Sequence, residues 1–185
     1  MDIAKLSKCG KILNFKPDEI ICMEKQEGET AYLILQGEAK VVLGSFNDAN
    51  KKMAVLPAGV IFGEMSLLEG KPRSATVLAG DEGNTVLEIG KNDFIDLMKT
   101  DPELAYKLLR TMYKRMEDSM ESHKNVLIAY NVETRRDAMY QQISKLSREQ
   151  FEAIVSKDSE YALKLLKYLS HMISDIDRKV LEISK

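Results

Sequence analysis

Residues 62–77 have the sequence FGEMSLLEGKPRSATV, and this stretch, here called the cassette, decides how the rest of the chain is interpreted. It joins a Gly-Glu pair, one short helical turn, a Gly-Lys-Pro corner and an arginine that precedes a strand. Gly63 lets the backbone approach a ligand because glycine has no Cβ, and Arg73 offers a planar fork of donors that matches phosphate oxygens. Glu64 only accepts hydrogen bonds when ionised, which suits sugar hydroxyls. We therefore expect a site for a small anion that also carries hydroxyls.

The stretch before the cassette adds a second pattern. Residues 27–41, EGETAYLILQGEAKV, predict a pair of strands. In this order the two stretches resemble the cyclic-nucleotide-binding domain, of the catabolite-activator and kinase-regulatory-subunit type. The resemblance covers roughly residues 10–125. It implies an α+β fold, in which a β-roll of the double-stranded jelly-roll type is followed by a long helix and an all-helical C-terminal tail.

The resemblance also implies a role for the cassette residues. Gly63 and Glu64 should contact the ribose, with Glu64 accepting from the 2′-hydroxyl. Arg73 should pair with the cyclic phosphate, with help from Ser74 and from backbone N–H groups near it. The full set of expected ligand-binding residues is Phe62, Gly63, Glu64, Met65, Ser66, Arg73, Ser74, Ala75, Thr76, Ser119 and Met120.

The identity of the base is less directly implied. By the resemblance, Ser119 or Met120 of the long helix lies where a hydroxyl could meet an adenine amino group, so cAMP is favoured and cGMP is the alternative ligand. The plain alternatives are that Arg73 and Glu64 pair with each other as surface ions, and that Ser74 only hydrogen-bonds locally.

The positions of glycine and proline divide the chain into two parts. All ten glycines lie at or before Gly90 and the last of the four prolines is Pro102, so the remainder is expected to be continuous helix. We therefore expect a nucleotide-binding domain at 1–131 and a helical tail at 132–185 that serves oligomerisation or partner binding. Within the first domain, residues 1–13 predict a short helix. Turn-bounded apolar runs predict strands at 19–24, 31–36, 39–43, 52–56, 76–79 and 85–89.

The helices after the roll have clear start signals. Asn92 is a candidate N-cap for a helix at 92–99, and Asp101 followed by Pro102 predicts a longer helix at 102–131. Apolar positions three and four residues apart form an a/d pattern along that helix. This pattern predicts a homodimer seam, and packing on the chain's own tail helices is the alternative. The seam comprises Leu109, Met112, Met116, Ser119, His123, Val126 and Tyr130.

The tail lies outside the resemblance. It predicts a helix at 135–146, a capping box at 147–150 and a last helix that opens at Asp158. The last helix has a seam of its own, and residues 93–120 align without a gap on residues 150–177, which suggests an internal repeat. The second seam comprises Leu166, Leu169, Ile173, Ile176, Val180 and Ile183.

The composition of the chain argues against several classes of function. A net charge of −2 and a tail without a basic stripe or wing strands argue against DNA binding. No apolar run could span a bilayer and no signal-peptide core is present, so we expect a cytoplasmic protein. Cys9 and Cys22 predict buried thiols, and two histidines predict neither a metal site nor catalysis; no cofactor is expected.

We therefore expect a receptor that converts nucleotide binding into rearrangement of its C-terminal helices, with an unidentified protein partner at the tail. The alternatives are a catabolite-activator-like transcription regulator with a divergent or missing DNA-binding domain, and a scaffold that retains the roll.

Overall fold

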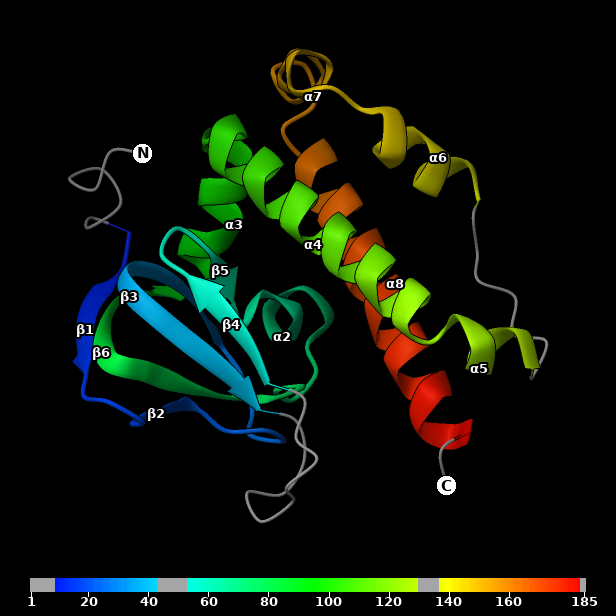
Figure 1. The fold of residues 1–185 in the computed structure, drawn as a ribbon. Helices are drawn as coiled ribbons and strands as arrows, with labels where there is room; N and C mark the ends of the chain where they lie inside the picture. The colour runs from blue at the N-terminus through cyan, green and yellow to red at the C-terminus, as the bar shows by residue number, and fades with distance from the viewer. Residues whose placement is uncertain (1–8, 43–52, 130–136, 184–185) are drawn as a thin grey trace. The chain divides into compact units, whose positions relative to one another are not determined.

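The chain divides into two compact units, Met1–Asp96 and Leu97–Lys185 (Figure 1). The computed structural model describes residues 9–42, 53–129 and 137–183. The first unit is a β-roll and the second is helical. The division falls earlier than the sequence-based boundary after residue 131, because the long helix α4 (Pro102–Ser122) packs against the last helix α8 (Tyr161–Ile183).

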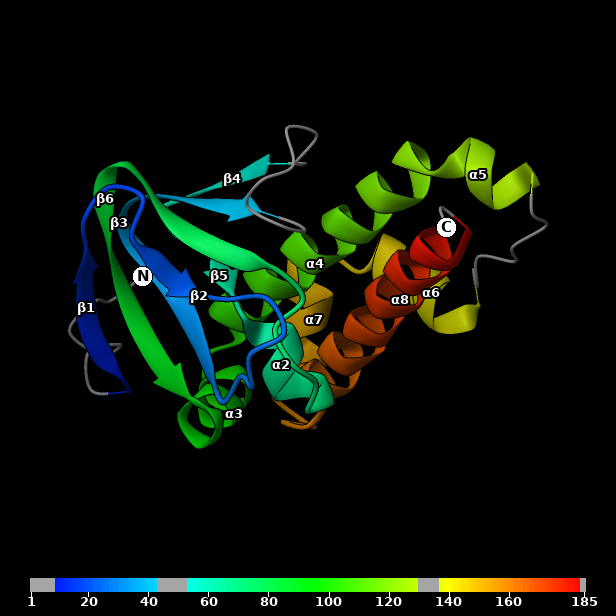
Figure 2. The same ribbon diagram turned by 90° about the horizontal axis from the view of Figure 1, so that it is seen from below.

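The roll is one antiparallel sheet with the strand order β1-β6-β3-β4. Two further short strands complete it, with β2 on β6 and β5 on β3. The long strands β3 and β6 form its centre (Figure 2). They pair from Thr30↔Gly90 to Val42↔Thr76. The strands are β1 Lys11–Phe15, β2 Ile20–Cys22, β3 Thr30–Val42, β4 Met53–Pro57, β5 Ile61–Phe62 and β6 Thr76–Gly90.

Two expected strand breaks are bulges within continuous strands. The pairs predicted at 31–36 and 39–43, and at 76–79 and 85–89, are single strands, β3 and β6. Gly37 and Gly83 lie at φ values of 76° and 75°, and the pairing register shifts near Gly37. A Cβ at Gly37 would lie 2.5 Å from the carbonyl oxygen of Gly83. Glycine therefore permits a tight bulge here without ending either strand.

The start of the chain differs from the helix predicted at 1–13. Residues 1–8 lie outside the described ranges, and Lys11–Phe15 is the strand β1, which pairs with β6. Leu13 packs against the core of the roll, so a cross-strand partner and burial outweigh a weak helical pattern. The two-residue strand β5 was also not predicted, because so short a strand has no readable alternation.

The helices after the roll begin at the predicted signals. Helix α3 spans Lys91–Thr100, and Asp101 caps α4 by accepting a hydrogen bond from the Leu104 N–H at 3.1 Å. The predicted helix at 102–131 is interrupted at His123, whose backbone N–H bonds to the carbonyl of Ser119, and α5 follows at Lys124–Ala129. Residues 130 and 131 lie outside the described ranges.

The central residues of the two predicted seams are buried within one chain. Leu109, Met112 and Met116 on α4 are almost completely inaccessible, and so are Leu166, Leu169 and Ile173 on α8. Since α4 and α8 pack together, this face of α4 is covered by the chain's own tail. The side chain of Val126 and the whole of Tyr130 lie outside the described residues.

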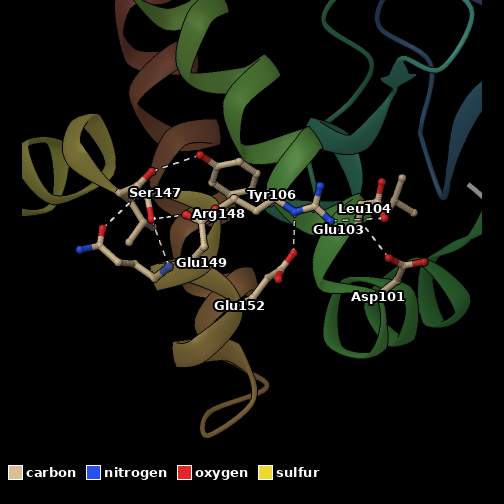
Figure 3. Close-up of polar contacts among 10 residues, drawn as sticks. Asp101, Glu103, Leu104, Tyr106, Ser147, Arg148, Glu149 and Glu152 are labelled. Atoms are coloured by element: carbon tan, nitrogen blue, oxygen red, sulfur yellow. Dashed lines mark hydrogen bonds and ion pairs between the residues drawn. The ribbon is translucent and has the colours of Figure 1, made fainter.

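The predicted capping box is present at the start of α7 (Arg148–Val155). The Ser147 hydroxyl accepts from the Gln150 N–H at 3.2 Å, and the Gln150 side chain accepts from the Ser147 N–H at 3.0 Å. Figure 3 shows Arg148 between two carboxylates, bonded to Glu152 at 2.7 Å and paired with Glu103 of α4 at 3.5 Å. The same helical unit contains α6, Ala138–Lys145, which covers part of the helix predicted at 135–146.

Two ion pairs involve residues at matching positions of the predicted internal repeat. Glu103 and Glu160 occupy equivalent positions in the two aligned segments, each near the start of a long helix. Glu103 pairs with Arg148 of α7, and Glu160 pairs with Lys99 of α3 at 2.6 Å. Each glutamate thus pairs with a basic residue of the other segment's short helix. The repeat itself stays a prediction.

Candidate functional site

The cassette forms a short helix between two glycines in the left-handed conformation. Helix α2 spans Glu64–Glu69, as the sequence predicted. Gly63 precedes it at φ 75° and Gly70 follows it at φ 66°. These backbone angles strain residues with a Cβ, so the two glycines allow the chain to enter and leave the turn sharply.

Arg73 lies inside the roll, with only 6% of its surface exposed. Its Nη1 donates to the carbonyl oxygen of Gly63 at 2.9 Å, and its Nη2 donates to the Thr30 hydroxyl at 3.0 Å. The guanidinium carbon lies 5.5 Å from the centre of the Tyr32 ring. The backbone is fixed as well, because the Arg73 N–H donates to the carbonyl of Gln26 at 2.8 Å.

Two glycines bring backbone directly against the guanidinium. A Cβ on Gly28 would lie 2.7 Å from Arg73 Nε and 2.8 Å from the Cβ of Ser66. A Cβ on Gly63 would lie 2.5 Å from Arg73 Nη1. A side chain at either position would therefore occupy space that the guanidinium now fills.

The alternative interpretation, in which Arg73 and Glu64 pair with each other as surface ions, does not describe this site. Glu64 is 5% exposed and Ser66 is equally buried, so both polar residues lie inside the roll with Arg73. Within the described residues, the hydrogen-bond acceptors of the Arg73 side chain are neutral oxygens, and it forms no ion pair. Since buried charges are normally paired, the arrangement suits a small anion as the partner of Arg73.

Two titratable groups close to Arg73, Cys22 and Tyr32, have raised pKa values. Burial raises the pKa of the Cys22 thiol, against the opposing effect of the nearby guanidinium. Burial also raises the pKa of Tyr32, whose hydroxyl donates to Glu88 at 3.3 Å. Both groups are therefore protonated and neutral near pH 7. Cys22 is buried as expected, whereas Cys9 is only partly buried.

The other expected cassette residues occupy different environments. Phe62 stacks on Tyr32 with ring centres 5.2 Å apart and belongs to the core of the roll. Thr76 is buried, and its hydroxyl accepts from the Glu24 N–H at 3.0 Å. Met65 and Ala75 are buried, whereas Ser74 is exposed. The structure thus brings Gly63, Ser66 and Arg73 together, next to Glu64.

Ser119 and Met120 belong to the second unit. The Ser119 hydroxyl lies 3.5 Å from a carboxylate oxygen of Asp177 on α8, and Met120 is buried within the helices. Their contact with a ligand stays a prediction.

Sequence reasoning missed Thr30 and Tyr32 as part of the site. They entered the sequence analysis only as part of the strand pattern at 27–41. Two residues apart on β3, they lie on the same face of the sheet. The signal that could have indicated contact with an arginine is a hydroxyl residue followed two positions later by an aromatic residue, just after Gly28.

The described residues limit other kinds of site. They contain no group of three or more histidine, cysteine, aspartate or glutamate side chains placed to hold a metal ion. No helix in the described ranges combines the length and the apolar character that crossing a membrane requires. After Gly90 the described residues form helices only, so they contain no strands that could make the wing of a winged helix-turn-helix.

Comparison with known families agrees with the fold and the cassette. Residues 12–101 match the family described as "Cyclic nucleotide-binding domain". The matched stretch runs from β1 to the end of α3 and includes the whole cassette. Residues 12–101 therefore have the sequence pattern and the β-roll fold of a cyclic nucleotide-binding domain.

Individual relatives share only part of their length with this chain. A cGMP-dependent protein kinase of Eimeria tenella is 35% identical over 85 residues, which are 46% of this chain and 8% of the kinase. This chain therefore spans less than a tenth of that relative. A transcriptional regulator from Thermotoga maritima has a similar crystal structure, with a TM-score of 0.56 and 25% identity over 70% of this chain and 98% of that one.

The catabolite activator protein of Thermus thermophilus shares the fold. The region that aligns with its crystal structure covers 92% of this chain and 94% of that protein's chain, with a TM-score of 0.57 and 16% sequence identity. At that identity the likeness shows the fold alone.

Proposed function

We propose that the roll is a receptor for a cyclic purine nucleotide and that Arg73 binds the cyclic phosphate. The observation that supports this most directly is a buried guanidinium whose hydrogen-bond partners in the described residues are neutral oxygens. A ligand phosphate would supply the negative charge that such a group lacks, and charge-assisted bonds of this kind are strong. The match of residues 12–101 to the cyclic nucleotide-binding model supports a cyclic nucleotide as this anion.

Glu64 completes the recognition of the sugar. Its carboxylate is buried beside the Arg73 site, and an ionised carboxylate can accept from the ribose 2′-hydroxyl. This contact would favour ribonucleotides over deoxyribonucleotides. We propose cAMP as the ligand in preference to cGMP, because the Ser119 hydroxyl suits an adenine amino group; this choice rests on the sequence resemblance.

Isothermal titration calorimetry with cAMP and with cGMP tests the proposal, and 5′-AMP serves as the control without a cyclic phosphate. We expect binding of cAMP, weaker binding of cGMP and little heat with 5′-AMP. Arg73→Ala should weaken binding by about a hundredfold or more, since a buried phosphate would lose its cation. A matched control is Lys71→Ala, which removes a half-exposed cation of the same segment that pairs with Glu69. The absence of heat with either cyclic nucleotide would leave the scaffold alternative as the better account.

We propose that nucleotide binding acts by rearranging the C-terminal helices and not by a catalytic step. We expect nucleotide binding to change the mobility of α4 and α8, which hydrogen exchange with and without ligand measures. Equal exchange in both states would contradict this expectation. DNA binding by the described helices is not expected, and a protein partner at the tail and a cytoplasmic location stay predictions.

The predicted homodimer through the α4 seam also stays untested. Because α8 already covers Leu109, Met112 and Met116, we propose that the seam is satisfied within the chain. A dimer through the same face would require α8 to be displaced or exchanged with a second copy.

A further inference from the structure

We propose that Thr30 and Tyr32 are positioning residues that hold the Arg73 guanidinium in the geometry that binds phosphate. This inference rests on the proposed function of Arg73. It assigns to the Arg73 side chain two supporting residues on strand β3. Neither residue belongs to the cassette, and both lie on strand β3, which precedes the cassette in the sequence.

The first support is a hydrogen bond with a defined edge of the guanidinium. Arg73 Nη2 donates to Thr30 Oγ1 at 3.0 Å, and Nη1 donates to the Gly63 carbonyl at 2.9 Å. These two bonds use two of the five N–H groups of the guanidinium, so three are not spent on them. Anchoring both terminal nitrogens fixes the rotation of the planar group while donors remain for an oxyanion.

The second support is the face of an aromatic ring. The guanidinium carbon lies 5.5 Å from the centre of the Tyr32 ring, a separation at which a cation is attracted to the ring face. Tyr32 cannot easily turn away, because its ring stacks on Phe62 with an interplanar angle of 22° and its backbone pairs with that of Phe62. A series of side-chain contacts from Phe62 to Tyr32 to Arg73 therefore connects the core of the roll to the guanidinium.

The physical reason for such supports is entropy. An arginine side chain has several rotatable bonds, and ordering a long side chain during binding costs conformational entropy. A guanidinium already ordered by Thr30, Tyr32 and the Gly28 backbone avoids most of that cost when a phosphate arrives. Thr30 and Tyr32 should therefore affect affinity without touching the nucleotide.

The test compares Thr30→Val with Thr30→Ser. Valine keeps the β-branched shape and removes the acceptor, whereas serine keeps the acceptor. We expect Thr30→Val to weaken cAMP binding about tenfold and Thr30→Ser to restore it to within about twofold of wild type. Melting temperatures should be similar for the three proteins, which separates a positioning role from a structural one.

The ring is tested in the same way. Tyr32→Phe keeps the aromatic face and loses only the hydroxyl that donates to Glu88, so affinity should be nearly unchanged. Tyr32→Leu removes the face and should weaken binding by several-fold. Should Tyr32→Leu fail to fold, the Thr30 pair and Tyr32→Phe still decide the proposal.

A spectroscopic measurement keeps the inference independent of nucleotide binding. Exchange of the Arg73 Nε–H proton, followed by NMR on protein labelled at arginine, should be faster in Thr30→Val than in wild type or Thr30→Ser. If wild type binds neither cyclic nucleotide, the proposed function fails, and this measurement still reports on positioning. If wild type binds and Thr30→Val matches it in both affinity and exchange, the positioning role is overturned.

Discussion

The Nη1 atom of Arg73 lies 2.9 Å from the carbonyl oxygen of Gly63, the residue whose left-handed backbone starts the cassette helix. The same glycine thus sets the backbone turn and supplies an acceptor to the buried cation. A Cβ at this position would lie 2.5 Å from that nitrogen. Backbone conformation and ligand chemistry are therefore linked at one residue.

Gly63→Ala should destabilise the roll by about 1–2 kcal/mol, the usual cost of placing a residue with a Cβ in the left-handed region. It should also weaken cAMP binding, because the methyl group pushes the guanidinium aside. Urea unfolding measures the first effect and calorimetry the second.

Gly70→Ala is the matched control for Gly63→Ala. Gly70 lies at φ 66° and a Cβ there would meet nothing within 4 Å. Its stability cost should be similar, whereas its affinity for nucleotide should be close to wild type. An equal loss of affinity in both variants would show that general distortion of α2, not the position of Arg73, governs binding.

The packing of α4 on α8 makes a second prediction. Leu109→Ala and Leu169→Ala each remove a completely buried side chain and should lower the free energy of unfolding of the helical unit by about 2–5 kcal/mol. Ile128→Ala, at a position that is 67% exposed, should cost far less.

The same experiment distinguishes packing within the chain from a dimer seam. If α8 covers α4 within one chain, the unfolding midpoint of wild type should not depend on protein concentration. A midpoint that rises with concentration would indicate that a second copy stabilises the helices.

The capping box at α7 makes a third prediction. Ser147→Ala removes the hydroxyl that accepts from the Gln150 N–H and should destabilise the helical unit by about 1 kcal/mol. Ser156→Ala is the control, because the hydroxyl of Ser156 only donates to the carbonyl of Ala153 at the other end of α7. Thermal unfolding followed by circular dichroism compares them, and equal losses in both variants would refute the capping role.

Asp158 makes the stability of the helical unit depend on pH. A hydrogen bond from Lys164 lowers the pKa of its carboxyl below the ordinary aspartate value, which is about 3.9. A carboxyl with a lower pKa in the folded state adds stability above its unfolded pKa and loses it as the pH falls through the folded pKa. The contribution should therefore be present at pH 5–7 and disappear below about pH 4.

Unfolding midpoints measured from pH 7 to pH 3 test this dependence. Asp158→Asn and Lys164→Gln should each lose less stability on acidification than wild type does. Lys167→Gln, an exposed lysine on the same helix, is the control and should keep the wild-type profile. The idea fails if all four proteins respond to acid alike.

Local chemistry explains which elements were predictable. The cassette helix, the start of α4 at Asp101 and the capping box at Ser147 all depend on residues close in sequence, so the sequence identified them. The bulges at Gly37 and Gly83 and the strand β1 depend on partners across the sheet. Their signals were therefore misread as strand breaks and as a helix.

Sequence analysis was enough to predict the type of fold and to single out Gly63, Glu64 and Arg73 as candidate site residues, because these three residues lie close together in one short segment. The burial of Arg73 and its contacts with Thr30 and Tyr32 became visible in the folded structure, since these partners are more than forty residues away in sequence. Only the tertiary structure likewise showed that the α4 seam is covered by α8. An apolar stripe predicts that one face of a helix is buried. The surface that covers this face depends on which elements the folded chain brings together.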